Sequence, residues 1–184
     1  VRVPFLSPGI AKPYQLVDFP GHLKYETLLS KLIVNEITLK QTKGVLYVID
    51  SSSSPAELKE ISRALFKLLA ITERKTGGID FLFALNKKDL FNLRPVFKIQ
   101  EILQQEINAL INETLSEKFS AQDDLDDDAD LEDLAHLKEF WLSVVSGLTF
   151  RFDMLEGNME FMSGSVLKGN TESWENWIDG KVVN

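Results

Sequence analysis

The sequence predicts an α/β fold with a mainly parallel sheet flanked by helices. Three apolar runs have strand character and stand at residues 14–17, 44–49 and 81–85, with a fourth candidate at residues 159–162. The first three are aromatic or β-branched and nearly continuous, which is typical of strands buried on both faces of a parallel sheet. Helical patterns lie between them, and this alternation favours parallel strands joined by right-handed crossovers.

Four helical patterns are predicted. They cover residues 22–43, a segment from residue 54 to the glycines at 77 and 78, a segment that begins at Pro95, and residues 171–179. Ser54 and Glu57 have the spacing of a capping box, with Pro55 at the first helical position. In the last helix Trp174 and Trp177 share one face, and we expect them to pack against the core rather than bind a ligand.

Composition predicts one ordinary globular domain over residues 1–184. The hydrophobic fraction is 44%, the charged fraction is 26% and the net charge is −8, without a basic patch for a phosphate backbone. We therefore expect no direct nucleic-acid partner. The absence of cysteine excludes disulfides and thiolate metal sites. No apolar run approaches the roughly 20 residues that span a bilayer.

Residues 120–135 are predicted to form an acidic, solvent-exposed insertion. Eight of the eleven residues from 123 to 133 are acidic, and their mutual repulsion disfavours burial. A calcium site is the alternative, but the glycine and the ligand spacing of an EF-hand loop are missing.

Two polar motifs follow predicted strands, where open α/β sheets bind their ligands. Asp18-Phe19-Pro20-Gly21 follows the first strand, and Asn86-Lys87-Lys88-Asp89 follows the third. In the second motif, the Asp89 carboxylate can accept two parallel hydrogen bonds from guanine, and adenine would leave it unpaired. Asn86 can bond to the base edge and tie neighbouring loops, and the Lys87 stem can lie over the base while its ammonium stays solvated. The alternative is a polar strand-to-helix turn.

The first motif is typical of a site for Mg²⁺ and the γ-phosphate. Asp18 would hold Mg²⁺ through a water, and the Gly21 amide would approach the phosphate because glycine has no Cβ. His22 stands where Ras-like enzymes place the residue that orients the attacking water, which makes it the candidate catalytic residue. The alternatives are a strand-ending turn at Pro20-Gly21 and an ordinary surface histidine.

These motifs resemble those of the signal recognition particle receptor beta subunit family, an Arf-related group of GTPases at the endoplasmic reticulum membrane. Residues 157–168 resemble its closing guanine loop, in which Ser165 and Val166 stand at the base-contacting positions. Residues 173–179 resemble its C-terminal helix. The resemblance implies a P-loop NTPase-like, Ras/Arf-like fold, in which the N-terminal strand and the P-loop are missing from this sequence.

The resemblance also implies ligands, partners and a location. GTP or GDP with Mg²⁺ would be bound, and hydrolysis would be slow or partner-dependent. The receptor's alpha subunit would be the main partner, with residues 2–8 contributing to the contact, and the ribosome or translocon would be further partners. The protein would act at the cytosolic face of the endoplasmic reticulum membrane, anchoring the alpha subunit there in co-translational protein targeting.

One departure from the family pattern leaves other functions open. The phosphate-binding motif G-x-x-x-x-G-K-[ST] is absent, and the chain opens at Val1. We expect that motif, and a hydrophobic span before it, to precede Val1 in the full-length protein. The alternatives are a nucleotide-free scaffold or adaptor of GTPase ancestry, an Arf-like trafficking GTPase, and a fragment of a translational GTPase.

Overall fold

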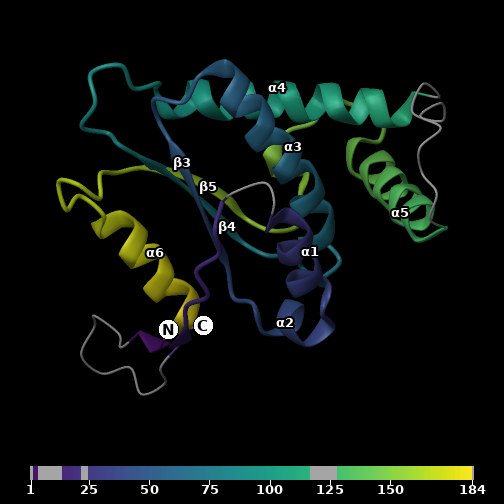
Figure 1. Ribbon diagram of the computed structural model, residues 1–184, viewed down its shortest axis with the longest axis horizontal. Helices are drawn as coiled ribbons and strands as arrows, with labels where there is room; N and C mark the ends of the chain where they lie inside the picture. Colours follow the sequence, from purple (N-terminus) through teal and green to yellow (C-terminus); the bar gives the residue numbers. More distant parts are fainter. Residues whose placement is uncertain (1, 4–13, 22–24, 117–127, 184) are drawn as a thin grey trace.

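A parallel three-stranded sheet forms the centre of the computed structural model, which describes residues 2–3, 14–21, 25–116 and 128–183 (Figure 1). Its strands are β3 (Val45–Asp50), β4 (Phe81–Asn86) and β5 (Met159–Ser163), in the order β3-β4-β5. The register pairs Asp50 with Asn86, so that the carboxyl ends of β3 and β4 are level. The predicted parallel α/β fold is confirmed.

Strand β4 is apolar throughout because both faces of the sheet are covered. Phe81, Phe83 and Leu85 belong to the larger core cluster, which also contains residues of α3 (Pro55–Thr72) and α4 (Val96–Leu115). Leu82 and Ala84 face the other way, into a smaller cluster with Trp174 and Trp177 of α6 (Glu172–Val183). The tryptophan pair therefore packs against the sheet, as predicted.

The helices divide between the two faces of the sheet. On one face α3 packs against α4 and against α1 (Glu26–Val34), and α5 (Asp128–Val145) packs against α3 and α4, while α6 lies across the other face (Figure 1). The remaining helices are α2 (Glu36–Gln41) and the short η3 (Phe152–Met154). The predicted capping box begins α3, since Ser54 Oγ accepts from the Glu57 amide at 3.3 Å and Glu57 Oε2 accepts from the Ser54 amide at 2.6 Å.

The prediction of a buried parallel strand at residues 14–17 is wrong. The strand there is β2 (Tyr14–Gln15), which pairs antiparallel with β1 (Arg2–Val3) in a separate two-stranded sheet. Leu16 and Val17 are 44% and 58% exposed. A short apolar run reports strand tendency but not the neighbour that the strand pairs with, and the neighbour decides burial.

Three helical boundaries also differ from the prediction. The pattern at residues 22–43 gives two helices, because Asn35 leaves the helical conformation and its side chain accepts from the Thr38 amide at 3.4 Å. Helix α3 ends at Thr72, ahead of Gly77 and Gly78, which both adopt positive φ. Residues 128–133 of the acidic segment lie in the first turns of α5, and residues 120–127 lie outside the described residues.

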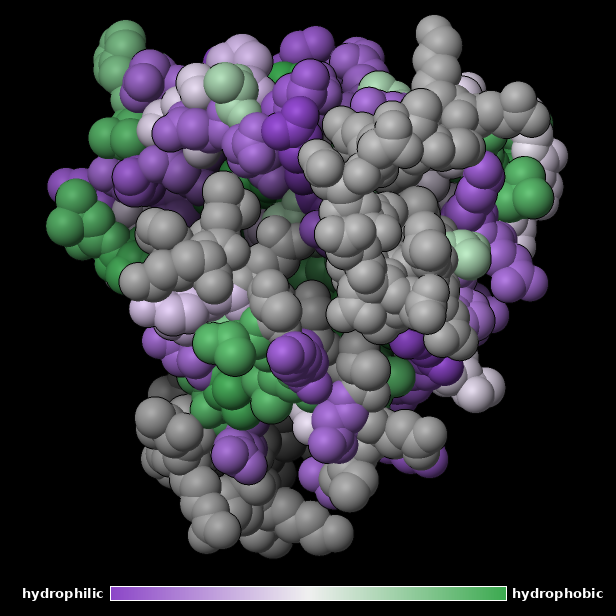
Figure 2. Space-filling model, turned by 45° about the vertical axis from the view of Figure 1, so that its right-hand side comes forward, coloured by the Kyte–Doolittle hydropathy of each residue, from purple (hydrophilic) through white to green (hydrophobic). Residues whose placement is uncertain are grey.

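The described surface carries both polar and exposed hydrophobic side chains. On the face in Figure 2, hydrophobic side chains occupy separate areas among hydrophilic ones. Within the described ranges, no helix has the length and apolar character that crossing a membrane requires.

Candidate functional site

The candidate site lies at the carboxyl ends of the three parallel strands. Residues 51–54 follow β3, the Asn86–Asp89 loop follows β4, and the loop of residues 164–170, called here the closing loop, follows β5. Parallel strands bring these three segments to one edge of the sheet. The guanine-type motif therefore stands at the end of the central strand, between segments that come from both neighbours.

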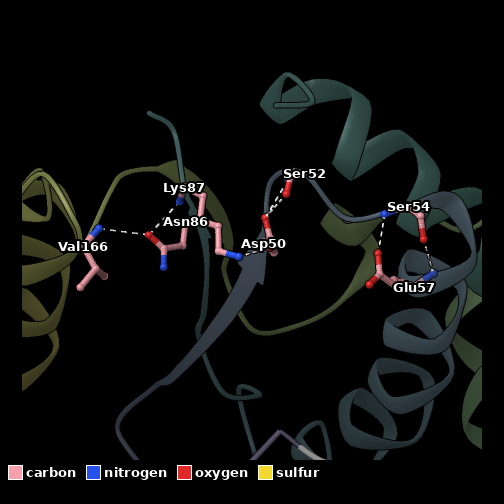
Figure 3. A network of polar contacts seen from close by, with 7 residues as sticks. All are labelled: Asp50, Ser52, Ser54, Glu57, Asn86, Lys87 and Val166. Carbon is pink, nitrogen blue, oxygen red and sulfur yellow. Dashed lines mark hydrogen bonds and ion pairs between the residues drawn. The ribbon is translucent and has the colours of Figure 1, made fainter. Parts of the chain in front are cut away.

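Asn86 ties the central loop to the closing loop. Its Oδ1 accepts from the Lys87 amide at 2.8 Å and from the Val166 amide at 3.1 Å (Figure 3). The backbone reinforces this contact, because Lys88 N donates to Gly164 O at 2.9 Å and Gly164 N donates to Leu85 O at 2.9 Å. The predicted loop-tying role of Asn86 is thus visible in the geometry.

Asp89 is held by Ser165. The Ser165 hydroxyl donates to Asp89 Oδ1 and its oxygen accepts from the Lys168 amide at 3.2 Å. Ser165 is 2% exposed, whereas Asp89 is exposed. The hydrogen bond from Ser165 lowers the pKa of Asp89, so the carboxylate stays ionised. A carboxylate has about four acceptor positions, which leaves capacity for a further donor pair.

The closing loop requires glycine at its first position. A Cβ on Gly164 would lie 2.6 Å from Asn170 O and 2.6 Å from the Trp174 ring. Ser165 and Asn170 close the loop with two backbone hydrogen bonds of 3.0 and 2.8 Å. The indole of Trp174 donates to Met162 O at 3.1 Å, and this bond fixes the ring that packs against Gly164. The buried Ser165 is therefore positioned by the packing of α6.

The ammonium of Lys87 is paired, not simply solvated as predicted. Its Nζ lies 2.5 Å from Asp50 Oδ2, although the side chain is 52% exposed (Figure 3). Lys87 has a φ of 67°, which is uncommon for a residue with a Cβ and costs backbone energy. Its pKa is raised by the hydrogen bond from its own ammonium to Asp50. The sequence does not reveal this partner, because the carboxylate comes from the end of a separate strand, β3.

Asp50 is the site residue that sequence reasoning missed. Its Oδ1 accepts from the amide and the hydroxyl of Ser52, at 2.8 and 2.7 Å. Partial burial works to raise the pKa of Asp50, but the bonds from Lys87 and Ser52 outweigh it and leave the pKa below its usual value. Only its position in the sequence could have identified Asp50, because it ends an apolar strand in the way that Asn86 does.

The other predicted residues are not joined to this cluster in the described part of the chain. Asp18 and Gly21 lie in the exposed segment that follows β2, outside the three-stranded sheet. A Cβ on Gly21 would have no atom within 4 Å. His22 lies outside the described residues, as do residues 4–8 of the predicted partner contact. Among described residues, no group of three or more histidine and acidic side chains is placed to hold a metal ion.

Comparison with known proteins gives a family. Residues 10–159 match the family model for the signal recognition particle receptor beta subunit. The signal recognition particle receptor subunit beta of Saccharomyces cerevisiae is 33% identical over 168 residues, which are 91% of this chain and 66% of that relative. The chain thus spans slightly less than two thirds of that relative's length.

Solved structures from Chaetomium thermophilum share the fold. The signal recognition particle receptor SRb-GTP/SRX complex has a TM-score of 0.67 at 19% identity, covering 92% of this chain and 68% of that chain. Signal recognition particle receptor SRb-GDP-Mg has a TM-score of 0.66 at 21% identity, covering 89% and 77% respectively. The family model and the yeast relative carry the assignment further than the fold alone: this chain belongs to the signal recognition particle receptor beta subunit family.

Proposed function

We propose that this chain is the guanine-nucleotide-binding part of a signal recognition particle receptor beta subunit. One observation carries the proposal: at the carboxyl edge of a parallel sheet the Ser165 hydroxyl donates to Asp89, and the amide of the next residue, Val166, donates to the Asn86 side chain. Such an ionised, oriented carboxylate suits the ring N–H and the exocyclic amine of guanine. The base would therefore be read by groups that are in place before it arrives.

The closing loop would read the guanine carbonyl, which lies next to the ring N–H that Asp89 would bind. The Val166 amide, which donates to Asn86 Oδ1 at 3.1 Å, would donate to the guanine carbonyl when nucleotide binds. Asn86 would share or release that contact, and its side chain would then face the base. The Lys87 stem would lie over the ring, with its ammonium held at the end of β3.

The phosphate end is proposed on family grounds. GTP and GDP with Mg²⁺ are the proposed ligands, and the solved relatives named for GTP and GDP-Mg support this choice. Asp18 would hold the ion, Gly21 would approach the terminal phosphate, and His22 would orient water in a slow or partner-dependent hydrolysis. Among described residues Asp18 belongs to no group of three or more side chains placed to hold a metal ion.

The proposed biological role is to anchor the receptor's alpha subunit at the cytosolic face of the endoplasmic reticulum membrane during co-translational targeting. Support comes from the relative that is named as an SRb-GTP/SRX complex. The membrane attachment would come from a segment outside this sequence, and the ribosome or translocon would be further partners. The acidic residues 120–135 are proposed to remain a solvated part of this single domain.

A nucleotide titration of the full-length protein tests the proposal. Calorimetry with GDP, ADP and xanthosine diphosphate should show binding of GDP at least about tenfold tighter than that of either competitor, because only guanine satisfies Asp89 and the Val166 amide together. A protein that binds none of the three would instead be the nucleotide-free scaffold. Recovery of the alpha subunit in a pulldown would distinguish the receptor from an Arf-like trafficking GTPase.

A further inference from the structure

The Asp50–Lys87 ion pair connects the end of β3 to the base-reading loop. The two residues are 37 positions apart in sequence, and their charged atoms lie 2.5 Å apart. The backbone adds a second connection, because Ser51 N donates to Asn86 O at 3.0 Å. The loop that carries Asp89 is therefore supported from β3 on one side and from the closing loop on the other.

The Asp50 carboxylate is oriented by Ser52 independently of its ion pair with Lys87. One carboxylate oxygen accepts two hydrogen bonds from Ser52, and the other faces the ammonium (Figure 3). Ser52 in turn lies in the short segment between β3 and α3, where Arg94 Nε donates to Ser53 O at 3.0 Å. The Asp50 carboxylate is thus held in one orientation. It provides a fixed position for the ammonium of the flexible Lys87 side chain.

The orientation of Lys87 matters because its backbone is unusual. Lys87 has a φ of 67°, and its ammonium reaches Asp50 at the end of β3. The Asn86 side chain fixes the start of this turn by accepting from the Lys87 amide. With both ends of the lysine held, its methylene stem spans the distance between Asn86 and Asp50.

We propose that Asp50 is a positioning residue for guanine binding, which acts by holding the Lys87 stem where the base plane lies. This role rests on the proposed function. Asp50 would not touch the nucleotide. Removal of the Asp50 charge would leave Lys87 free to sample other rotamers. The base would then be released sooner, because the lysine stem would regain rotamer freedom whenever the base leaves.

The test uses release of a fluorescent GDP from the full-length protein. Asp50→Asn keeps an oxygen that accepts from Ser52 but loses the charge, and release should become about two- to fivefold faster, the range of an exposed ion pair. Lys87→Gln should accelerate release as well. In the Lys87→Gln background, Asp50→Asn should change release by less than about 1.5-fold, because Asp50 acts through Lys87.

Asp153→Asn is the matched control, since it removes an equally simple ion pair, with Arg151, that lies outside the site. Its GDP release should equal that of the unchanged protein. Equal acceleration by Asp50→Asn with and without Lys87 would overturn the positioning role while leaving guanine binding intact. Absence of GDP binding in the unchanged protein would instead overturn the proposed function, and this role with it.

Discussion

The buried hydroxyl of Ser165 donates a hydrogen bond to Asp89, across 76 positions of sequence. This contact joins the loops that follow β5 and β4, and it selects one orientation of an otherwise exposed carboxylate. A carboxylate that is oriented in advance loses less freedom when a base binds. The affinity for guanine should therefore depend on Ser165, although the Ser165 hydroxyl donates to Asp89 and not to the base.

Ser165→Ala should weaken GDP binding by roughly fivefold to tenfold, which corresponds to about 1–1.4 kcal/mol, the net contribution of one ordinary hydrogen bond. The Asp89 carboxylate would then sample several rotamers, and its pKa would return toward the ordinary value because the Ser165 bond is the main cause of its depression. Calorimetric titration with GDP at pH 7 measures the change. Ser173→Ala, an exposed serine on α6, is the control and should bind GDP normally.

Gly164 and Gly180 should respond oppositely to alanine. At Gly164 the new methyl would meet Asn170 O and the Trp174 ring, so Gly164→Ala should lower the free energy of unfolding by about 1–3 kcal/mol. At Gly180, within α6, the methyl meets nothing within 4 Å, and alanine should raise the free energy of unfolding by up to about 1 kcal/mol. Urea unfolding of both variants checks the pair, and a stabilised Gly164→Ala would contradict the crowded closing loop.

The predictable part of the fold follows from burial. Strand β4 was predictable because helices cover both faces of the sheet there, which makes residues 81–85 continuously apolar. Strand β3 was predictable from a similar apolar run, although Val48 is 56% exposed and the prediction of burial on both faces holds only in part there. The strand at β2 was misread for a related reason. Residues 14–17 also contain apolar side chains, but β2 pairs with β1 outside the main sheet, and pairing between separate segments leaves no local pattern.

The candidate site also contains residues that the sequence indicates and one that it does not. Asn86, Asp89 and Ser165 could be singled out from the sequence because their groups and spacings are typical of guanine sites. In the structure Ser165 donates to Asp89, and the Val166 amide donates to Asn86. Asp50 belongs to no such pattern, since any polar residue can end a strand. Only the register of β3 with β4, which places Asp50 level with Asn86, gives it a role.

Asp80 should make stability depend on pH. Its carboxylate lies 2.6 Å from Lys181 Nζ and accepts from the Asn158 amide at 2.7 Å. Partial burial works to raise the pKa of Asp80, but these bonds prevail and lower it. Since the folded pKa lies below the unfolded one, Asp80 contributes stability at neutral pH that is lost as the pH falls below about 4.

Asp80→Asn should therefore reduce the free energy of unfolding at pH 7 by about 1 kcal/mol, and the difference from the unchanged protein should shrink at pH 3. Urea unfolding at the two pH values measures both differences. Asp153→Asn serves as the control, because its pair with Arg151 is exposed and should contribute little at either pH. A destabilisation by Asp80→Asn that is the same at pH 7 and pH 3 would show that the charge is not responsible.

Asp89→Asn should change which base the protein prefers. The carboxylate accepts from the ring N–H and the amine of guanine, whereas an amide presents one acceptor and one donor. Xanthine carries a carbonyl where guanine carries the amine, so it matches the amide and repels the carboxylate. We expect GDP affinity to fall at least about tenfold and xanthosine diphosphate to become the tighter ligand. Competition titration of both nucleotides measures the preference, and unchanged GDP affinity would place the base elsewhere. Because the Asn substitution retains an oxygen for the Ser165 hydroxyl, a switch in preference would reflect the base edge itself and not collapse of the loop.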